Sequence, residues 1–349
     1  MTIHASPFLH AARLRIAWAL GSLLLGTSIA SAGELTIYTS TEGDNLKDFA
    51  ERFSKANPDI KVNWVRDSTG VLQARAVAEK DNPRNDVVFA HAATSLLALD
   101  KMGLLLPYAP VGVEKLDPRY RDKSDPPHWS GMWGFATAIC FNTVEAKKRN
   151  LPRPTKWADL TDPVYRGQIT MPNPVSSGTG FLNVSGWMQI WGAEKAWSFM
   201  DKLHQNMASY SHSGSKPCEQ VASGEYVLGI SLPWRAATLK TMGAPIDVIV
   251  PEEGVGWEMQ GVAIMKATRN LPDAKRFVDW AISQPAMEAY ARRVEVVAVP
   301  VQAPRAENVP ADLSAKMIKN DFVWASANQA AILTEWRTRY DGKTEPRKP

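Results

Sequence analysis

Apolar and polar positions in the first part of the chain follow two different periods. "ELTIYTS" and "IKVNWVRD" alternate as strands do, and "DVVFAH" predicts a third strand. Between them, "DNLKDFAERFSKANP" places Leu46, Phe49 and Phe53 at near-helical spacing, and "STGVLQARAVAEK" predicts a helix behind a capping Ser/Thr. "ATSLLALDKMG" predicts a helix that ends at Gly103. This strand–helix alternation is typical of an α/β domain with a largely parallel sheet.

The same alternation returns after an irregular, proline-rich stretch from Tyr108 to Pro127. "MWGFATAICFN" predicts one buried strand that leads into a second region. Helices are expected there over 179–191, 193–205, 217–223 and 234–242, and strands near 208–212, in "YVLGISL" and in "IDVIVP". "GVAIMK" then leads to helices over 274–282, 287–293 and 323–338. The last residues, "DGKTEPRKP", are expected to fray.

The number of strands indicates how the regions are connected. The first region has about three strands, too few for a covered sheet, so late strands and helices are expected to complete it. The chain must then cross to the second region near Gly134 and return near Gly261. We therefore expect a discontinuous first lobe, 33–134 plus 261–349, and a second lobe, 135–260. Two crossings form a hinge, with a cleft that suits closure around a ligand.

The N-terminal segment predicts export. Arg13 and Arg15 precede the apolar run "IAWALGSLLLGTSIA", and Ala30-Ser31-Ala32 follows it. This order predicts a signal peptide over residues 1–32, cleaved after Ala32, and therefore export from the cytoplasm. The apolar run is too short for a membrane anchor. The remaining chain has 38 basic and 36 acidic residues, a net charge of +2 without a basic cluster, so nucleic acid is not an expected partner.

The chain has two cysteines, Cys140 and Cys218. An oxidising compartment allows them to form a disulfide, but the sequence does not give the distance between them. The pairing stays open at this point.

Signatures of catalysis and of metal binding are absent from the sequence. There is no G-x-S-x-G nucleophile elbow, no G-x-x-x-x-G-K-[ST] loop and no H-x-x-x-H pair. We therefore expect no enzyme activity, no metal and no cofactor, and the candidate cleft favours a binding protein.

Ligands of open α/β sheets bind beyond the carboxyl ends of the strands, at helix starts. "PNPVSSGTGF" and "YSHSGSKPCEQ" both place hydroxyls and a glycine before a helix, which suits a phosphate or phosphonate. An ordinary N-cap is the alternative for each turn. The candidate anion contacts are Ser176, Ser177, Thr179, Ser213, Ser215 and Lys216, with Arg235 from "LPWRAATL".

A second group of residues suits a positively charged ligand group. A carboxylate beside an aromatic face binds an ammonium group well. The candidates are Thr41 and Glu42 after the first strand, Trp234, and Trp257 and Glu258 of "GVGWEMQG". Which of the two acids meets the ammonium group stays open.

Several of these stretches together resemble a known family. The predicted signal peptide, "ELTIYTSTEG", "NDVVFA", "PVYRGQITMPNPVSSGTGF" and "ASGEYVLGIS" resemble the periplasmic solute-binding proteins of ABC transporters, in the group that binds ferric iron, sugar phosphates and phosphonates. The resemblance implies the type II fold: two α/β lobes joined by two hinge strands, with the ligand between them. It also implies a monomer that delivers a small molecule to a permease in the inner membrane.

Smaller features of the resemblance bear on the ligand. Ferric binders of this group carry paired tyrosines after the strand that corresponds to "YVLGIS", whereas this chain has Pro233 and Trp234 there. "DKLHQNMASYSHSGSKPCEQVASGEY", "SSGTGF" and "GVGWEMQG" are similar to proteins assigned as 2-aminoethylphosphonate-binding. The resemblance therefore implies 2-aminoethylphosphonate or a related organophosphonate. A receptor for ferric iron, sugar phosphate or polyamine, a secreted phosphoryl-transfer enzyme and a structural envelope protein are the alternatives.

Overall fold

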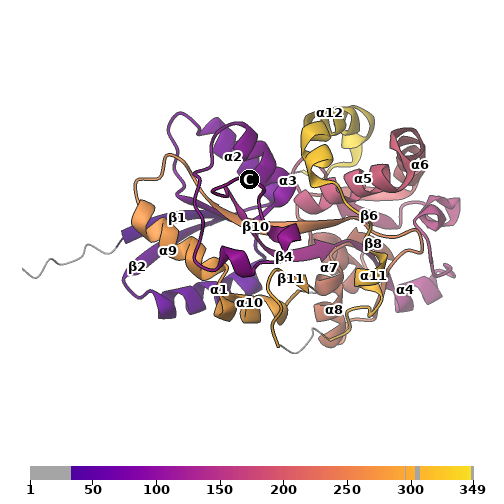
Figure 1. Cartoon of the computed structure of the whole chain (residues 1–349). Helices are drawn as coiled ribbons and strands as arrows, with labels where there is room; N and C mark the ends of the chain where they lie inside the picture. Colours follow the sequence, from indigo (N-terminus) through magenta and orange to yellow (C-terminus); the bar gives the residue numbers. More distant parts are fainter. Residues whose placement is uncertain (1–32, 295, 303–306, 347–349) are drawn as a thin grey trace, which may run out of the picture. The chain divides into compact units, whose positions relative to one another are not determined.

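The structure is a computed structural model that describes residues 33–294, 296–302 and 307–346. The expected signal peptide, residues 1–32 with cleavage after Ala32, lies outside these ranges. Among the described residues, no helix has the length and apolar character needed to cross a membrane. The described chain builds two β-sheets, each covered by helices on both faces, which form two α/β lobes (Figure 1).

The sheet of the first lobe has six described strands in the order β11-β4-β10-β3-β1-β2. β1 pairs in parallel with β2 and β3, while β10 is antiparallel to both β3 and β4. The late strands therefore complete this sheet as expected, but they make it mixed rather than largely parallel. The strands are β1 Gly33–Thr39, β2 Ile60–Arg66, β3 Val87–Ala92, β4 Ser130–Ala136, β10 Trp257–Ile264 and β11 Val296–Val297.

The sheet of the second lobe has five described strands in the order β7-β6-β8-β5-β9. β6 is parallel to β7 and β8, and β5 is antiparallel to β8 and β9. The strands are β5 Ala138–Asn142, β6 Ile169–Pro172, β7 Met207–Ser211, β8 Leu228–Ser231 and β9 Ile246–Ile249.

Helices on the first lobe cover both faces of its sheet. In Figure 1, α2 and α3 lie on one face, and α1, α9 and α10 lie on the other. Phe49 and Phe53 of α1 are buried because their spacing puts both on one side of the helix; their rings lie 4.8 Å from those of Tyr290 and Phe277, respectively. The helices are α1 Gly43–Ala56, α2 Thr69–Ala78, α3 Ala93–Lys101, α9 Leu271–Ala281 and α10 Gln284–Ala291.

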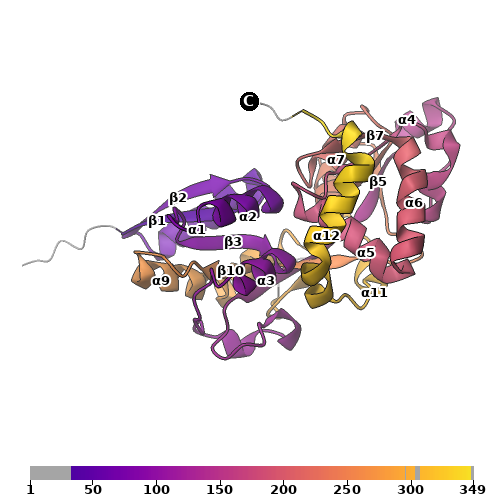
Figure 2. The same ribbon diagram turned by 90° about the horizontal axis from the view of Figure 1, so that it is seen from above.

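The second lobe is built in the same way, with α5 and α6 on one face and α7 and α8 on the other (Figure 1). The last helix, α12, packs against α3 of the first lobe and α5 of the second (Figure 2). These helices are α4 Thr143–Lys148, α5 Gly178–Trp191, α6 Ala193–Asn206, α7 Lys216–Ala222, α8 Pro233–Thr241, α11 Leu313–Lys316 and α12 Phe322–Tyr340.

The chain crosses between the lobes where the sequence predicts a single strand. "MWGFATAICFN" divides at Thr137 into β4, which belongs to the first sheet, and β5, which belongs to the second. Every residue of both strands is buried, so the sequence shows no alternation that would mark the division. The chain returns between β9 and β10.

Two further contacts fix the second lobe. Cys140 on β5 and Cys218 on α7 form a disulfide, with Cα atoms 5.5 Å apart, which ties the helix to the sheet. The C-terminal tail does not fray at its described residues, contrary to expectation. After α12 the chain makes a 3-10 turn, Asp341–Lys343, and Thr344 bridges to Tyr210 of β7.

Candidate functional site

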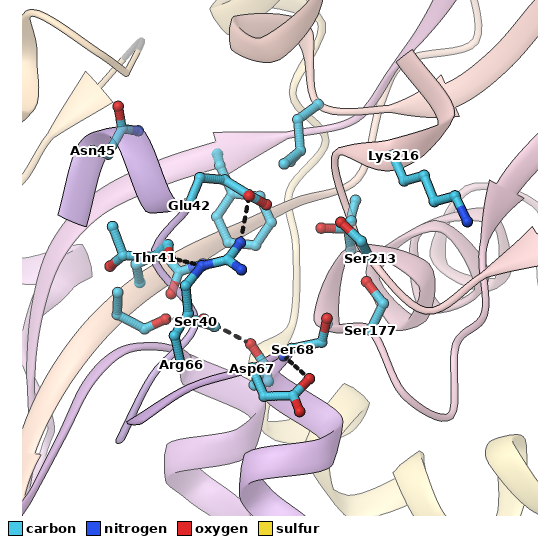
Figure 3. Close-up of a pocket in the computed structure, with 18 of the residues that line it drawn as sticks. Ser40, Thr41, Glu42, Asn45, Arg66, Asp67, Ser68, Ser177, Ser213 and Lys216 are labelled. Carbon is cyan, nitrogen blue, oxygen red and sulfur yellow. Dashed lines mark hydrogen bonds and ion pairs between the residues drawn. The ribbon is translucent and has the colours of Figure 1, made fainter. Parts of the chain in front are cut away.

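A cavity of about 960 Å³ lies between the two lobes. Loops after β1 and β2 supply its first-lobe wall, and the starts of α5, α7 and α8 supply its second-lobe wall. Most of these loops follow the carboxyl ends of strands, where α/β sheets place ligands. In Figure 3, Ser40, Thr41, Glu42 and Ser68 lie on one side of the cavity, and Ser177, Ser213 and Lys216 lie on the other.

The loop after β1 contributes Ser40, Thr41 and Glu42 to the cavity. Its conformation is held by Arg66, the last residue of β2: Nε donates to the Thr41 carbonyl at 2.7 Å, and a terminal nitrogen pairs with Glu42 Oε2 at 2.6 Å. Arg66 was missed from the sequence, where it looks like a surface residue of an alternating strand. Its position at a strand's carboxyl end is the signal that could have identified it.

The loop after β2 adds Asp67, Ser68 and Thr69. Asp67 Oδ1 accepts the Ser68 N–H at 2.7 Å, and no basic side chain of the described residues pairs with this carboxylate. Ser68 precedes α2 but does not cap it; its hydroxyl instead donates to the His212 carbonyl of the second lobe at 2.7 Å. Asp67 therefore brings an unpaired negative charge to the cavity.

The start of α5 supplies Ser177, Gly178 and Thr179. Ser177 is the N-cap of this helix and accepts the Gly180 N–H at 3.4 Å, so the capping alternative holds for its side chain. Ser177 nevertheless lines the cavity, and so does Thr179, so both remain within reach of a ligand.

The turn after β7 lies against the α5 start. A Cβ added at Gly214 would lie 2.5 Å from Thr179 Oγ1, so a larger residue at 214 would require the Thr179 side chain to move. Ser213 and Lys216 line the cavity. The structure thus brings the two hydroxyl-rich turns together, which the sequence could not establish.

Two serines predicted in these turns do not reach the cavity. Ser176 is 2% exposed and its hydroxyl bonds to His212 Nδ1 at 2.9 Å, while Ser215 is 2% exposed with its Oγ 3.2 Å from Ser213 Oγ. Both side chains are buried, and their hydrogen bonds are with residues of the turn after β7. Their prediction as direct ligand contacts is therefore corrected: they support the turn.

Three other predicted contacts also lie elsewhere. Arg235 pairs with Glu219 at 2.8 Å and does not line the cavity. Trp257 is buried, and its indole N–H donates to the Ile318 carbonyl at 2.9 Å. Glu258 is 3% exposed and accepts from Thr94 Oγ1 at 2.7 Å, and burial raises the pKa of its carboxyl to about 7. None of the three is placed to meet a ligand in this cavity.

The cavity therefore unites part of the predicted set with residues that the sequence did not single out. The predicted residues that line it are Thr41, Glu42, Ser177, Thr179, Ser213, Lys216 and Trp234. The additional polar and aromatic residues include Arg66, Asp67, Ser68, Glu345, Phe49, Trp133 and Phe135.

The metal-binding potential of the described residues lies outside the cavity. Asp100, Asp122 and His128 are spaced as metal ligands would be, but none of them lines the cavity. No tyrosine is among the cavity residues of the described chain, so the phenolates of a ferric site are missing there.

Comparison with known proteins gives consistent results. The profile of a family described as bacterial extracellular solute-binding protein matches residues 39–288. An uncharacterized protein of Haemophilus influenzae is 30% identical over 326 residues, which cover 90% of this chain and 92% of that protein. A probable ABC transporter periplasmic-binding protein of Sinorhizobium fredii is 28% identical, over 88% of this chain and 86% of its own.

A solved structure also matches nearly the whole described fold. The periplasmic binding protein AfuA from Actinobacillus pleuropneumoniae, with fructose-6-phosphate bound, superposes with a TM-score of 0.83 and 30% identity. The match covers 89% of this chain and 99% of that protein.

Proposed function

Because this chain belongs to the family of bacterial extracellular solute-binding proteins, we propose a ligand for it: 2-aminoethylphosphonate or a closely related organophosphonate. The chain is the periplasmic solute-binding component of an ABC importer and, like its relatives, a binding protein rather than an enzyme. The proposal concerns which molecule it captures between the lobes and delivers to the permease.

The charge of the cavity is the observation that carries the proposal. Its described lining contains two basic side chains, Arg66 and Lys216, and three acidic ones, Glu42, Asp67 and Glu345. Each basic residue is already paired with an acid, Arg66 with Glu42 and Lys216 with Glu345. Asp67 is left over, so the cavity favours a ligand that brings its own positive charge.

The opposite end of the ligand is accounted for by the α5 start. Ser177 and Thr179 offer hydroxyls, and the first turn of this 14-residue helix offers free N–H groups with the positive end of the dipole. These groups suit a phosphonate. An ammonium group two carbons away would then meet Asp67, with the aromatic face of Trp234 as a further contact.

A sugar phosphate is the second candidate, because the relative AfuA was solved with fructose-6-phosphate bound. The phosphate would use the same α5 start, and Asp67 would accept hydrogen bonds from sugar hydroxyls. Ferric iron is disfavoured because no tyrosine of the described chain lines the cavity. A polyamine is disfavoured because it has no anionic group for the hydroxyls and free N–H groups at the α5 start.

Titration calorimetry separates these candidates. We expect heat of binding with 2-aminoethylphosphonate, and weaker or no binding with fructose-6-phosphate, spermidine and ferric citrate. Tighter binding of fructose-6-phosphate than of the phosphonate would make the sugar phosphate the better assignment.

A variant at Asp67 tests the role of the unpaired acid. Asp67→Asn should weaken the binding of 2-aminoethylphosphonate about tenfold, or about 1.4 kcal/mol, and should not weaken the binding of ethylphosphonate, which lacks the amine. Asp81→Asn, at an exposed site outside the cavity, is the matched control. Equal losses for both phosphonates in Asp67→Asn would show that Asp67 does not meet the ammonium group.

A further inference from the structure

The described C-terminal tail returns to the second lobe and is held there at several points. Lys343 Nζ donates to the carbonyls of His204 at 2.6 Å and Met207 at 2.7 Å. The Glu345 N–H donates to the Tyr210 carbonyl at 2.9 Å, beside the bridge between Thr344 and Tyr210. The tail therefore adds to the edge strand β7 as an ordered segment.

This attachment places the Glu345 carboxylate in the wall of the cavity. Oε1 accepts the His212 N–H at 2.9 Å, and Oε2 forms an ion pair with Lys216 Nζ. The Glu345 carbonyl also lies 2.9 Å from His212 Nε2. Since His212 Nδ1 lies 2.9 Å from the Ser176 hydroxyl, both ring nitrogens have hydrogen-bond partners, one of them on the tail.

These contacts are the ones that an anionic ligand would make. The Glu345 carboxylate accepts from the main-chain N–H of His212 and pairs with the ammonium group of Lys216, two groups at the turn after β7. The pair keeps solvent access, with Lys216 35% and Glu345 20% exposed. An ion pair of this exposure contributes little to stability, so a ligand can displace it at small cost.

We propose that Glu345 is an internal competitor for the anionic group of the ligand. Lys216 lines the same cavity as the α5 start, so the phosphonate and the Glu345 carboxylate would compete for this cation, and an anion that contacts Lys216 would displace Glu345 from it. Glu345 is thus a specificity-determining residue: it lowers the affinity of every anionic ligand. Ligands that also carry a cationic group can offset this loss through a second contact, so they bind more tightly than simple anions. The inference rests on the proposed function in one respect, that the ligand carries an anionic group.

Glu345→Gln tests the competition directly. The amide oxygen of Gln can still accept the His212 N–H, but the variant releases Lys216 from its charged partner. Calorimetry should show inorganic phosphate and 2-aminoethylphosphonate both binding about three- to tenfold more tightly than to the wild type. Glu252→Gln is the matched control, because Glu252 pairs with Lys156 at 3.3 Å outside the cavity and its loss should change neither affinity.

The same substitution in a Lys216→Gln protein shows whether the gain in affinity comes from releasing Lys216 or from another change in the structure. In a Lys216→Gln protein there is no cation to release, so adding Glu345→Gln should produce no further gain. The proposal is overturned if Glu345→Gln leaves the phosphate affinity unchanged, or if phosphate binds to neither protein. It is also overturned if the variant weakens only 2-aminoethylphosphonate, since Glu345 would then hold the ammonium group.

Failure of the proposed function has a different signature. If 2-aminoethylphosphonate does not bind to the wild type but phosphate gains affinity in Glu345→Gln, the competition stands and the ligand assignment falls.

Discussion

The Glu258 carboxyl shows how a single buried acid responds to its surroundings. It accepts hydrogen bonds from Thr94 Oγ1 at 2.7 Å and from the Met259 N–H at 3.0 Å. These bonds favour the ionised form, but the loss of water outweighs them and raises the pKa to about 7. The sequence alone placed Glu258 at the ligand, because "GVGWEMQG" does not reveal which side of β10 is covered by α3.

The raised pKa predicts a pH-dependent stability. A carboxyl whose pKa rises from 4.5 to about 7 on folding stabilises the fold fully below pH 4.5, and this contribution is lost as the pH rises through 7. The full change corresponds to about 3 kcal/mol. In Glu258→Gln, which cannot ionise, urea denaturation should show that the stability relative to the wild type increases between pH 5 and pH 8.

The titration of His91 does not affect the comparison between the wild type and Glu258→Gln. Burial lowers the pKa of His91 to about 3, but His91 titrates in both proteins and its effect cancels in the difference. A difference in unfolding free energy that does not change between pH 5 and pH 8 would rule out Glu258 as the responsible group.

Contacts between helix starts hold the two lobes together beside the cavity. The Gly70 N–H donates to the Ser176 carbonyl at 3.1 Å, and the Ser68 hydroxyl donates to the His212 carbonyl at 2.7 Å. A Cβ added at Gly70 would lie 2.5 Å from the Val175 carbonyl oxygen. The first turn of α2 can therefore approach the second lobe only because residue 70 has no side chain.

Gly70→Ala should consequently disfavour the close approach of the two lobes at this contact. Alanine suits the helical position, so the unfolding free energy should change by less than about 1 kcal/mol. Ligand affinity should fall about tenfold or more, and the radius of gyration with ligand, measured by small-angle X-ray scattering, should exceed that of the wild type. Gly43→Ala is the control, since a Cβ there meets nothing within 4 Å. An unchanged affinity in Gly70→Ala would show that closure does not require this contact.

The elements themselves were largely predictable from the sequence. The sequence predicts α1 and α12 to within a few residues. In each helix the buried residues recur at helical spacing, Phe49 and Phe53 in α1 and Ile332, Trp336 and Tyr340 in α12. The division of "MWGFATAICFN" was not predictable, since β4 and β5 are buried throughout and differ only in the sheet that they join. The position of Glu345 in the cavity wall was not predictable either. It depends on the bridge between Thr344 and Tyr210 of β7, two residues that lie far apart in the sequence.

At the scale of the whole molecule, the candidate site combines charged groups from two lobes. The first lobe supplies Arg66, Glu42 and Asp67, and Lys216 and Glu345 lie at the second. The hydroxyl-rich turns were identified from the sequence, because helix-start chemistry is local. Three features of the site depend on the fold, because they arise where separate strands end at one cavity. They are the close approach of the two turns at Gly214, the guanidinium of Arg66 and the unpaired carboxylate of Asp67. Local pattern therefore found more of the cavity residues that suit an anionic group than of those that suit a cationic one.

The most direct test of this account is a crystal structure of the protein with 2-aminoethylphosphonate. The account predicts phosphonate oxygens about 2.7–3.2 Å from the groups at the α5 start, Ser177 and Thr179 among them. The ammonium group should lie within about 4 Å of the Asp67 carboxylate. A cavity that stays empty at saturating ligand, or a phosphonate bound away from the α5 start, would contradict it.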